Sequence, residues 1–127
     1  MRRVVVDSGL ILAWFTGAAG PARVLRAEYE RGDVTLVAPR MLVPEILEAV
    51  ARATDWRAKR LTALADELDR LGLELRDPPS SELAGQLARG IGAGDAAYAA
   101  LASSLGIPLE TQDEELLKSA STVARRA

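Results

Sequence analysis

The sequence predicts an α/β fold: a three-layer α/β/α domain with a central parallel sheet of four or five strands. Short apolar runs rich in β-branched residues, of which 4–6 and 34–38 are the clearest, are typical of strands buried on both faces. These runs alternate along the chain with longer helical segments. Such alternation is the order of a parallel sheet with right-handed crossovers.

The size and composition of the chain favour a single domain covering residues 1–127, with no second domain. Its 127 residues are 49% apolar and 27% charged, a balance typical of globular, soluble proteins. No apolar run approaches the roughly 18 to 20 residues needed to cross a bilayer. We therefore expect a cytoplasmic protein with no membrane contact.

The expected elements follow from apolar spacing and from the glycines and prolines between them. Strands are expected at 4–6, 34–38, 73–75 and 107–111, with a weaker fifth near 122–123, and helices at 8–16, 22–31, 41–54, 56–71, 80–89, 96–105 and 114–120. Asp55 is expected to cap the helix at 56–71, and Ser80 or Ser81 to cap the next one. Gly106 is expected to end the helix at 96–105.

The chain contains no His and no Cys. These absences exclude zinc fingers, thiol nucleophiles, Ser-His-Asp triads and histidine bases. Any chemistry must use oxygen groups, Lys, Arg or a metal held by oxygen, and oxygen ligands favour Mg²⁺ or Mn²⁺. The net charge of −2 gives no overall attraction for nucleic acid.

Four acidic residues are expected at one edge of the predicted sheet. Asp7 follows the strand at 4–6, Asp113 follows the strand at 107–111, and Asp95 and Glu45 lie at or near helix starts. Ligands bind at the carboxyl ends of parallel strands, so these acids face one rim. Crowded carboxylates repel one another unless a cation neutralises them, and Mg²⁺ or Mn²⁺ supplies that charge. Thr111 can orient a carboxylate or a water molecule there.

Each acid also has a plain structural interpretation. Asp is a favoured helix N-cap, so Asp7, Asp95 and Asp113 can be caps, and Glu45 can be a solvated helical side chain. Glu48 is better explained by an ion pair with Arg52, four residues on. The functional interpretation depends on the four acids together.

The chain resembles the PIN domains, and specifically the VapC-type toxins of prokaryotic toxin-antitoxin pairs. Four stretches carry the resemblance: Val-Val-Val-Asp-Ser at 4–8, Pro-Glu-Ile-Leu-Glu-Ala-Val at 44–50, Gly-Asp-Ala-Ala-Tyr-Ala-Ala-Leu-Ala at 94–102 and Pro-Leu-Glu-Thr-Gln-Asp-Glu-Glu-Leu at 108–116. The chain departs from the family at Gly9, where a small polar residue is usual, at Glu48, often Asn, and at Glu110, usually apolar.

The resemblance implies a ribonuclease whose Mg²⁺ or Mn²⁺ ligands are Asp7, Glu45, Asp95 and Asp113, with Thr111 as a supporting hydroxyl. It also implies a homodimer and a small antitoxin whose tail packs into a groove beside the active site. Large aromatic side chains anchor helical partners, so candidates for that groove are Trp14, Phe15 and Trp56. The alternative is that these aromatics are ordinary core residues.

The main hypothesis is an endoribonuclease, the toxin of a type II toxin-antitoxin pair, that hydrolyses RNA phosphodiesters with a metal-activated water. The alternative is a non-catalytic PIN-fold binding module acting through dimerisation or partner binding. A receiver domain fits less well, because neither Lys59 nor Lys118 follows an apolar strand. A haloacid-dehalogenase-type phosphatase would need an acid at position 9, which is glycine.

Overall fold

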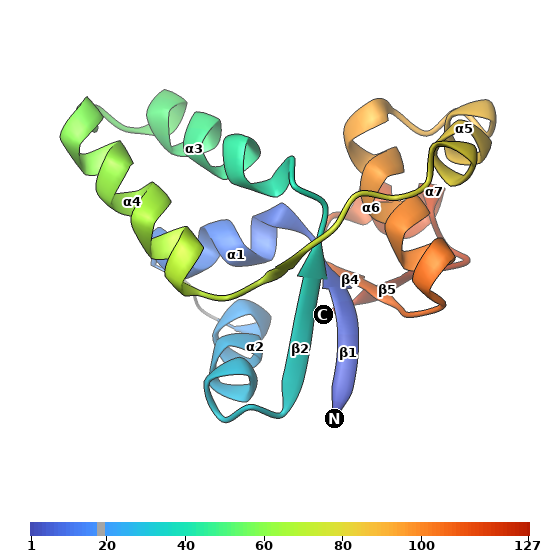
Figure 1. Cartoon of the computed structure of the whole chain (residues 1–127), viewed down its shortest axis with the longest axis horizontal. Helices are drawn as coiled ribbons and strands as arrows, with labels where there is room; N and C mark the ends of the chain where they lie inside the picture. Colours follow the sequence, from blue (N-terminus) through green and yellow to red (C-terminus); the bar gives the residue numbers. More distant parts are fainter. Residues whose placement is uncertain (18–19) are drawn as a thin grey trace.

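A five-stranded parallel sheet runs through the part of the chain that the computed structural model describes, residues 1–17 and 20–127 (Figure 1). Its strands lie in the order β3-β2-β1-β4-β5. The strands are β1 (Arg2–Val6), β2 (Val34–Ala38), β3 (Glu74–Leu75), β4 (Leu109–Thr111) and β5 (Ala124–Arg126). The helices of the same residues are α1 (Ser8–Phe15), α2 (Pro21–Glu30), α3 (Leu42–Ala53), α4 (Ala58–Arg70), α5 (Ser80–Ala88), α6 (Ala93–Leu105) and α7 (Glu114–Ser119). The predicted three-layer α/β/α class is confirmed.

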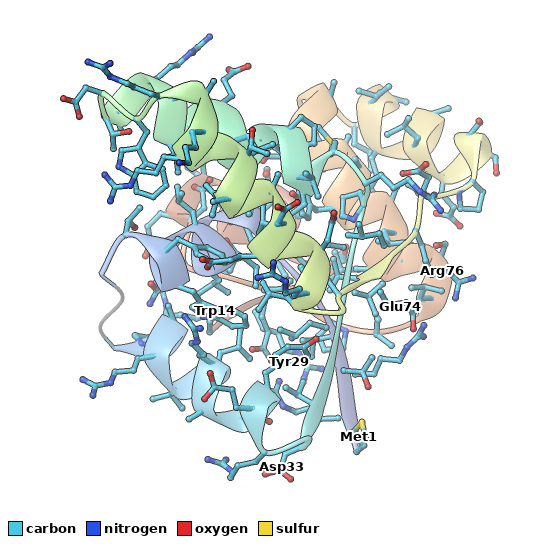
Figure 2. The ribbon with its side chains drawn as sticks, turned by 60° about the vertical axis from the view of Figure 1, so that its left-hand side comes forward. Met1, Trp14, Tyr29, Asp33, Glu74 and Arg76 are labelled. Atoms are coloured by element: carbon cyan, nitrogen blue, oxygen red, sulfur yellow. The ribbon has the colours of Figure 1, made fainter. Side chains whose placement is uncertain are left out.

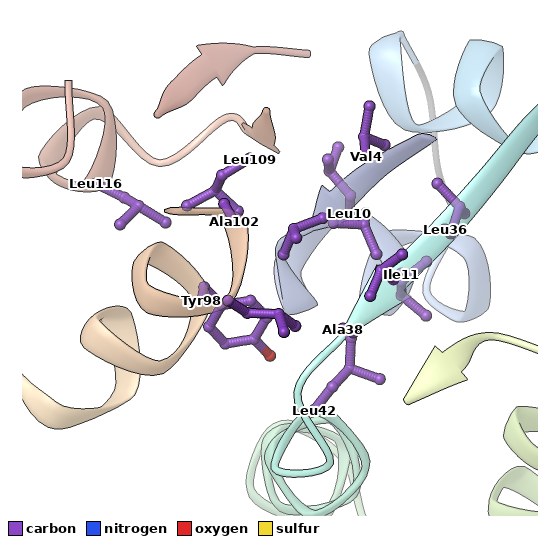
Figure 3. Close-up of a cluster of buried hydrophobic side chains, with 14 of the residues drawn as sticks. Val4, Leu10, Ile11, Leu36, Ala38, Leu42, Tyr98, Ala102, Leu109 and Leu116 are labelled. Carbon is purple, nitrogen blue, oxygen red and sulfur yellow. The ribbon is translucent and has the colours of Figure 1, made fainter. Parts of the chain in front are cut away.

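Strand β1 is the centre of the fold because its valines are buried on both faces. Val4, Val5 and Val6 are all fully buried, and β1 pairs in parallel with β2 on one side and β4 on the other. Side chains from both faces of the sheet complete the core around them (Figure 3). The expectation that a β-branched run marks a doubly covered strand is thus met.

The helices position the ends of the strands. Helix α6 packs on β1 and β4, and its face of small alanines allows close approach. Helix α1 contacts α2 and α3, and α3 pairs with α4. Figure 1 shows α1 to α4 gathered on the side of β2, and α5 to α7 on the side of β4 and β5. None of the helices in the described ranges is long and apolar enough to span a membrane.

Polar contacts link inner strands of the sheet to one another and to the helices. Glu110 interrupts the apolar pattern of β4 because it forms an ion pair with Arg2, which also binds Glu28 of α2. Next to Glu28 in α2, the ring of Tyr29 lies 5.9 Å from the ring of Trp14 in α1 (Figure 2). The Tyr29 hydroxyl donates to the carbonyl of Leu71 at the end of α4.

Several boundaries differ from the sequence-based expectation. Asp55 does not cap α4, which begins at Ala58 and has Arg57 as its N-cap residue. The bend before it is held by the Thr54 hydroxyl, which accepts a hydrogen bond from the backbone N–H of Trp56 at 3.2 Å.

At α5 the N-cap is Pro79, so Ser80 and Ser81 lie inside the helix rather than capping it. The weak last strand exists, but at 124–126 instead of 122–123, because backbone pairing with β4 sets its register. Gly106 ends α6 in the left-handed conformation, at φ 66°, as expected.

Candidate active site

The acidic residues gather at the point between β1 and β4 where the order of the strands reverses. The chain leaves β1 for β2 on one side, and later returns to form β4 on the other side of β1. Asp7 directly follows β1, and Thr111 is the last residue of β4. The carboxyl ends of strands at such a switch point border a crevice between the outgoing connections, where ligands bind in parallel α/β folds.

A cleft of about 390 Å³ opens at this point. All four acids chosen from the sequence line it, together with a small set of polar and apolar neighbours. The lining residues are Asp7, Ser8, Gly9, Leu10, Glu45, Asp95, Tyr98, Gln112 and Asp113. Segments far apart in the sequence therefore bring these carboxylates to one place.

The Thr111 hydroxyl joins the ends of β1 and β4. It is fully buried, donates to Asp7 Oδ2 at 2.7 Å and accepts from the backbone N–H of Asp113 at 2.9 Å. Asp7 occupies the N-cap position of α1 but makes no side-chain capping bond there. The capping alternative for Asp7 is therefore not what the structure has, and its carboxylate faces the cleft.

A second hydroxyl, which the sequence analysis did not single out, holds Glu45. The Tyr98 hydroxyl donates to Glu45 Oε1 at 2.6 Å. Tyr98 is only 1% exposed. The available signal was its spacing: Tyr98 lies three residues after Asp95, on the same face of the helix.

Asp95 and Asp113 are held by helix starts. Asp95 lies in the first turn of α6, whose N-cap residue is Gly92. Asp113 is the N-cap of α7, and its Oδ1 accepts from the backbone N–H of Glu115 at 2.9 Å. The capping interpretation is therefore correct for one oxygen of Asp113, while the residue also lines the cleft.

Burial and mutual repulsion raise the pKa values of Asp7, Glu45 and Asp95. Burial is the main cause for Asp7, where the Thr111 hydrogen bond offsets part of it and the charge of Asp113 adds to it. Burial also raises the pKa of Glu45, with Tyr98 opposing and the charges of Asp7 and Asp95 adding to the rise. The pKa of Asp95 is raised by burial and by Asp113, Asp7 and Glu115.

No Lys or Arg compensates this charge within residues 1–17 and 20–127. The ion pairs found there lie elsewhere, including the expected pair of Glu48 with Arg52 at 3.1 Å. An uncompensated group of carboxylates destabilises a fold and attracts a cation. The donor set, all carboxylate and hydroxyl oxygen, suits Mg²⁺ or Mn²⁺. In the same described ranges, however, no three of these acids are grouped as a ready-made metal site.

The three aromatic residues predicted to bind a partner line another pocket, of about 380 Å³, with Arg26 and Arg60. Trp14 is 6% exposed and donates its indole N–H to the Ala22 carbonyl at 2.8 Å, so it belongs to the core. Phe15 and Trp56 are half-buried, and the Arg60 guanidinium lies 4.0 Å from the Trp56 ring centroid.

The fold and the cleft together define a parallel α/β domain with an acidic site at the switch point of its sheet. The family model of the PIN domain matches residues 4–121, and the chain belongs to the PIN domain family. PIN domains are generally nucleases. The family inferred from the sequence motifs is thereby confirmed.

Two solved structures resemble this one. PAE2754 from Pyrobaculum aerophilum is 25% identical in sequence, with a TM-score of 0.65 over 99% of this chain and 89% of that one. FitAcB from Neisseria gonorrhoeae is 20% identical, with a TM-score of 0.68 over 95% of each chain. No curated protein matches the sequence.

Proposed function

We propose that this PIN domain is a divalent-metal-dependent endoribonuclease and the toxin of a type II toxin-antitoxin pair. The observation that carries the proposal is the cleft at the switch point, which four carboxylates line with no cationic partner among the described residues. A purely structural role does not account for collecting negative charge in one place.

The residues that would hold Mg²⁺ or Mn²⁺ are Asp7, Glu45, Asp95 and Asp113. A bound divalent ion supplies positive charge to a phosphodiester oxygen and makes water a stronger nucleophile. Thr111 fixes the orientation of Asp7 through its hydrogen bond. With no histidine in the chain, these carboxylates are also the groups available to accept a proton from the attacking water.

The test is cleavage of RNA by purified protein with Mg²⁺ or Mn²⁺, compared with two matched glutamate variants of α3. Glu45→Gln should lower the rate by about 100-fold, which corresponds to about 3 kcal/mol of transition-state stabilisation. Glu48→Gln removes an exposed carboxylate from the same helix, outside the cleft, and should keep the wild-type rate.

Asp95→Asn and added EDTA should also abolish cleavage. Because water rather than the ribose 2′-hydroxyl attacks phosphorus, the products should carry no 2′,3′-cyclic phosphate. Equal cleavage by wild type, Glu45→Gln and Asp95→Asn would reveal a contaminating nuclease. No cleavage by any sample on a broad set of RNAs would favour the alternative, a non-catalytic binding module.

We further propose that the pocket lined by Trp14, Phe15 and Trp56 takes part in binding an antitoxin. Membership of the PIN domain family, together with the resemblance of the sequence motifs to VapC-type toxins, supports such a partner. Half-buried aromatics beside open space are typical anchors for a partner helix or tail. Trp56 is better suited than Trp14, because the Trp14 ring is already packed in the core.

The natural candidate for this partner is the product of a short neighbouring reading frame. In a binding assay with that product, Trp56→Ala should weaken affinity by at least tenfold. Leu87→Ala, at an exposed apolar residue of α5 away from the pocket, is the control and should bind normally. Equal affinity for both variants would remove Trp56 from the interface. Light scattering tests the proposed homodimer, and a cytoplasmic location stays a prediction.

A further inference from the structure

Two of the four acids in the cleft each have one oxygen engaged by a buried hydroxyl. Thr111 donates to Asp7 Oδ2 at 2.7 Å, and Tyr98 donates to Glu45 Oε1 at 2.6 Å. Both hydroxyl-bearing residues are at most 1% exposed. Each hydroxyl reaches its acid from a different element, since β4 holds Thr111 and α6 holds Tyr98.

Tyr98 is held rigidly where it meets Glu45. Its ring lies among the core side chains of α6, a helix that packs on β1 and β4 (Figure 3). A buried phenol needs a hydrogen-bond partner, and the hydroxyl of Tyr98 finds it in the Glu45 carboxylate. Rotating the phenol away would cost both the bond and the packing of the ring.

We propose that Tyr98 is a positioning residue that makes Glu45 a one-oxygen metal ligand. The inference rests on the proposed metal-dependent function. Oε1 uses one of its lone pairs to accept the phenolic hydrogen bond, whereas Oε2 accepts no hydrogen bond from the described residues and is the more available oxygen for a cation. Oε2 lies close to Gly94, in the first turn of α6: a Cβ atom added to Gly94 would be 4.0 Å from it. Asp95 is the next residue in the same turn.

One-oxygen carboxylate ligands suit some ions better than others. Mg²⁺ requires near-ideal octahedral geometry and keeps several waters, whereas Ca²⁺ takes six to eight oxygens and often binds both oxygens of a carboxylate. Holding one oxygen of Glu45 in a hydrogen bond therefore favours Mg²⁺ over Ca²⁺. The positioning contact deepens the proposed function by setting which ion the cleft selects.

The test is calorimetric titration of metal-free protein with Mg²⁺ and, separately, with Ca²⁺. Tyr98→Phe keeps the ring and removes only the hydroxyl. It should weaken Mg²⁺ binding by about tenfold, as is typical when a group that orients a metal ligand is removed, and should lower the preference for Mg²⁺ over Ca²⁺. Tyr29→Phe removes a hydrogen-bonded hydroxyl outside the cleft and should change neither quantity.

A double-mutant cycle separates positioning from a general loosening of the structure. In a Glu45→Gln background, adding Tyr98→Phe should cause no further loss of Mg²⁺ affinity. If the same tenfold loss persists there, Tyr98 acts on the fold rather than through Glu45. A Tyr98→Phe protein that binds Mg²⁺ within twofold of wild type, with an unchanged preference over Ca²⁺, overturns the inference alone. Wild-type protein that binds neither ion overturns the proposed metal dependence as well.

Discussion

Replacing Thr111 by valine tests whether one hydroxyl holds the acidic cleft together. Valine has nearly the shape of threonine, so the change removes the polar contacts and little else. Thr111 is 0% exposed, donates to Asp7 Oδ2 at 2.7 Å and accepts from Asp113 N–H at 2.9 Å. Both partners lose a hydrogen bond that no other described side chain supplies.

The expected cost follows from the two contacts. A hydrogen bond to a charged group contributes about 1.5–3 kcal/mol and a neutral one about 0.5–1.5 kcal/mol. The valine variant should therefore lose about 2–4 kcal/mol of unfolding free energy at neutral pH. For a domain of this size, that corresponds to a fall of about 6–15 °C in melting temperature. Thr111→Ser keeps the hydroxyl, loses one methyl group and should cost about 1 kcal/mol.

The loss should depend on pH. The Thr111 hydrogen bond opposes the rise in the pKa of Asp7, so removing it lets that pKa rise further. A carboxyl with a raised pKa in the folded state stabilises the fold while it is protonated, and this contribution disappears as the pH increases. The cost of Thr111→Val relative to Thr111→Ser should therefore grow as the pH rises from the ordinary pKa of Asp7, 3.8, through its raised pKa in the folded protein.

Urea unfolding of metal-free protein at several pH values measures this difference. If the valine and serine variants agree within about 0.5 kcal/mol at pH 7, the Thr111 hydroxyl does not hold the cleft together. If they differ by the same amount at every pH, the cost is not linked to the charge of Asp7.

Other consequences of the same charges can be measured directly. Burial raises the pKa of Asp7 above its ordinary value of 3.8, so metal-free protein should lose stability as the pH rises from that value through the raised pKa of the folded protein. Asp7→Asn should make stability depend less on pH, and in EDTA at pH 7.5 it should melt at a higher temperature than wild type. A lower melting temperature would argue against an uncompensated charge at Asp7. Mg²⁺ at about 100 times its dissociation constant should stabilise the wild-type protein by about 2.7 kcal/mol and should hardly stabilise Asp7→Asn. Thermal unfolding measures both effects. Equal increases in the two melting temperatures would place the ion away from Asp7. Away from the cleft, Arg2→Met leaves Glu110 without its ion-pair partner and should lower the free energy of unfolding, measured in urea, by about 1–3 kcal/mol. The double variant Arg2→Met, Glu110→Leu leaves no unpaired carboxylate there and should lose less. RNA cleavage by the folded Arg2 variants should stay at the wild-type rate.

The sheet could be predicted because burial on both faces leaves a strong mark on a strand. Val4 to Val6 and the run at 34–38 read as strands for that reason, and β2 has the predicted limits. The last strand, Ala124–Arg126, carries no such mark. It is a short edge strand with a polar sequence, and its parallel pairing with β4 uses backbone groups that leave little trace in the side chains.

The cleft was predictable to the extent that topology alone decides it. Acids that follow parallel strands, or begin helices that run antiparallel to them, come to one edge of the sheet, and the four chosen from the sequence line one pocket. The contact of Tyr98 with Glu45 was not predictable in this way, since it depends on how α6 packs relative to α3. The cap assigned to Asp55 failed because the neighbouring Thr54 hydroxyl holds the bend instead.

The distribution of charge explains why a bound cation is expected to affect substrate attraction and stability as well as the reaction itself. The arginine side chains that form ion pairs in the described residues do so with acids outside the cleft, as Arg2 does with Glu28 and Glu110. The carboxylates inside it are moderated by the hydroxyls of Thr111 and Tyr98, which orient charge but do not cancel it. If RNA is the substrate, as proposed, its phosphates would meet carboxylates that no described Lys or Arg compensates, in a chain whose net charge is −2. Under the proposed function, a divalent ion would have to make the site attractive to RNA before it could assist the reaction. The same uncompensated carboxylates that would lower stability without the ion would then provide the affinity for it.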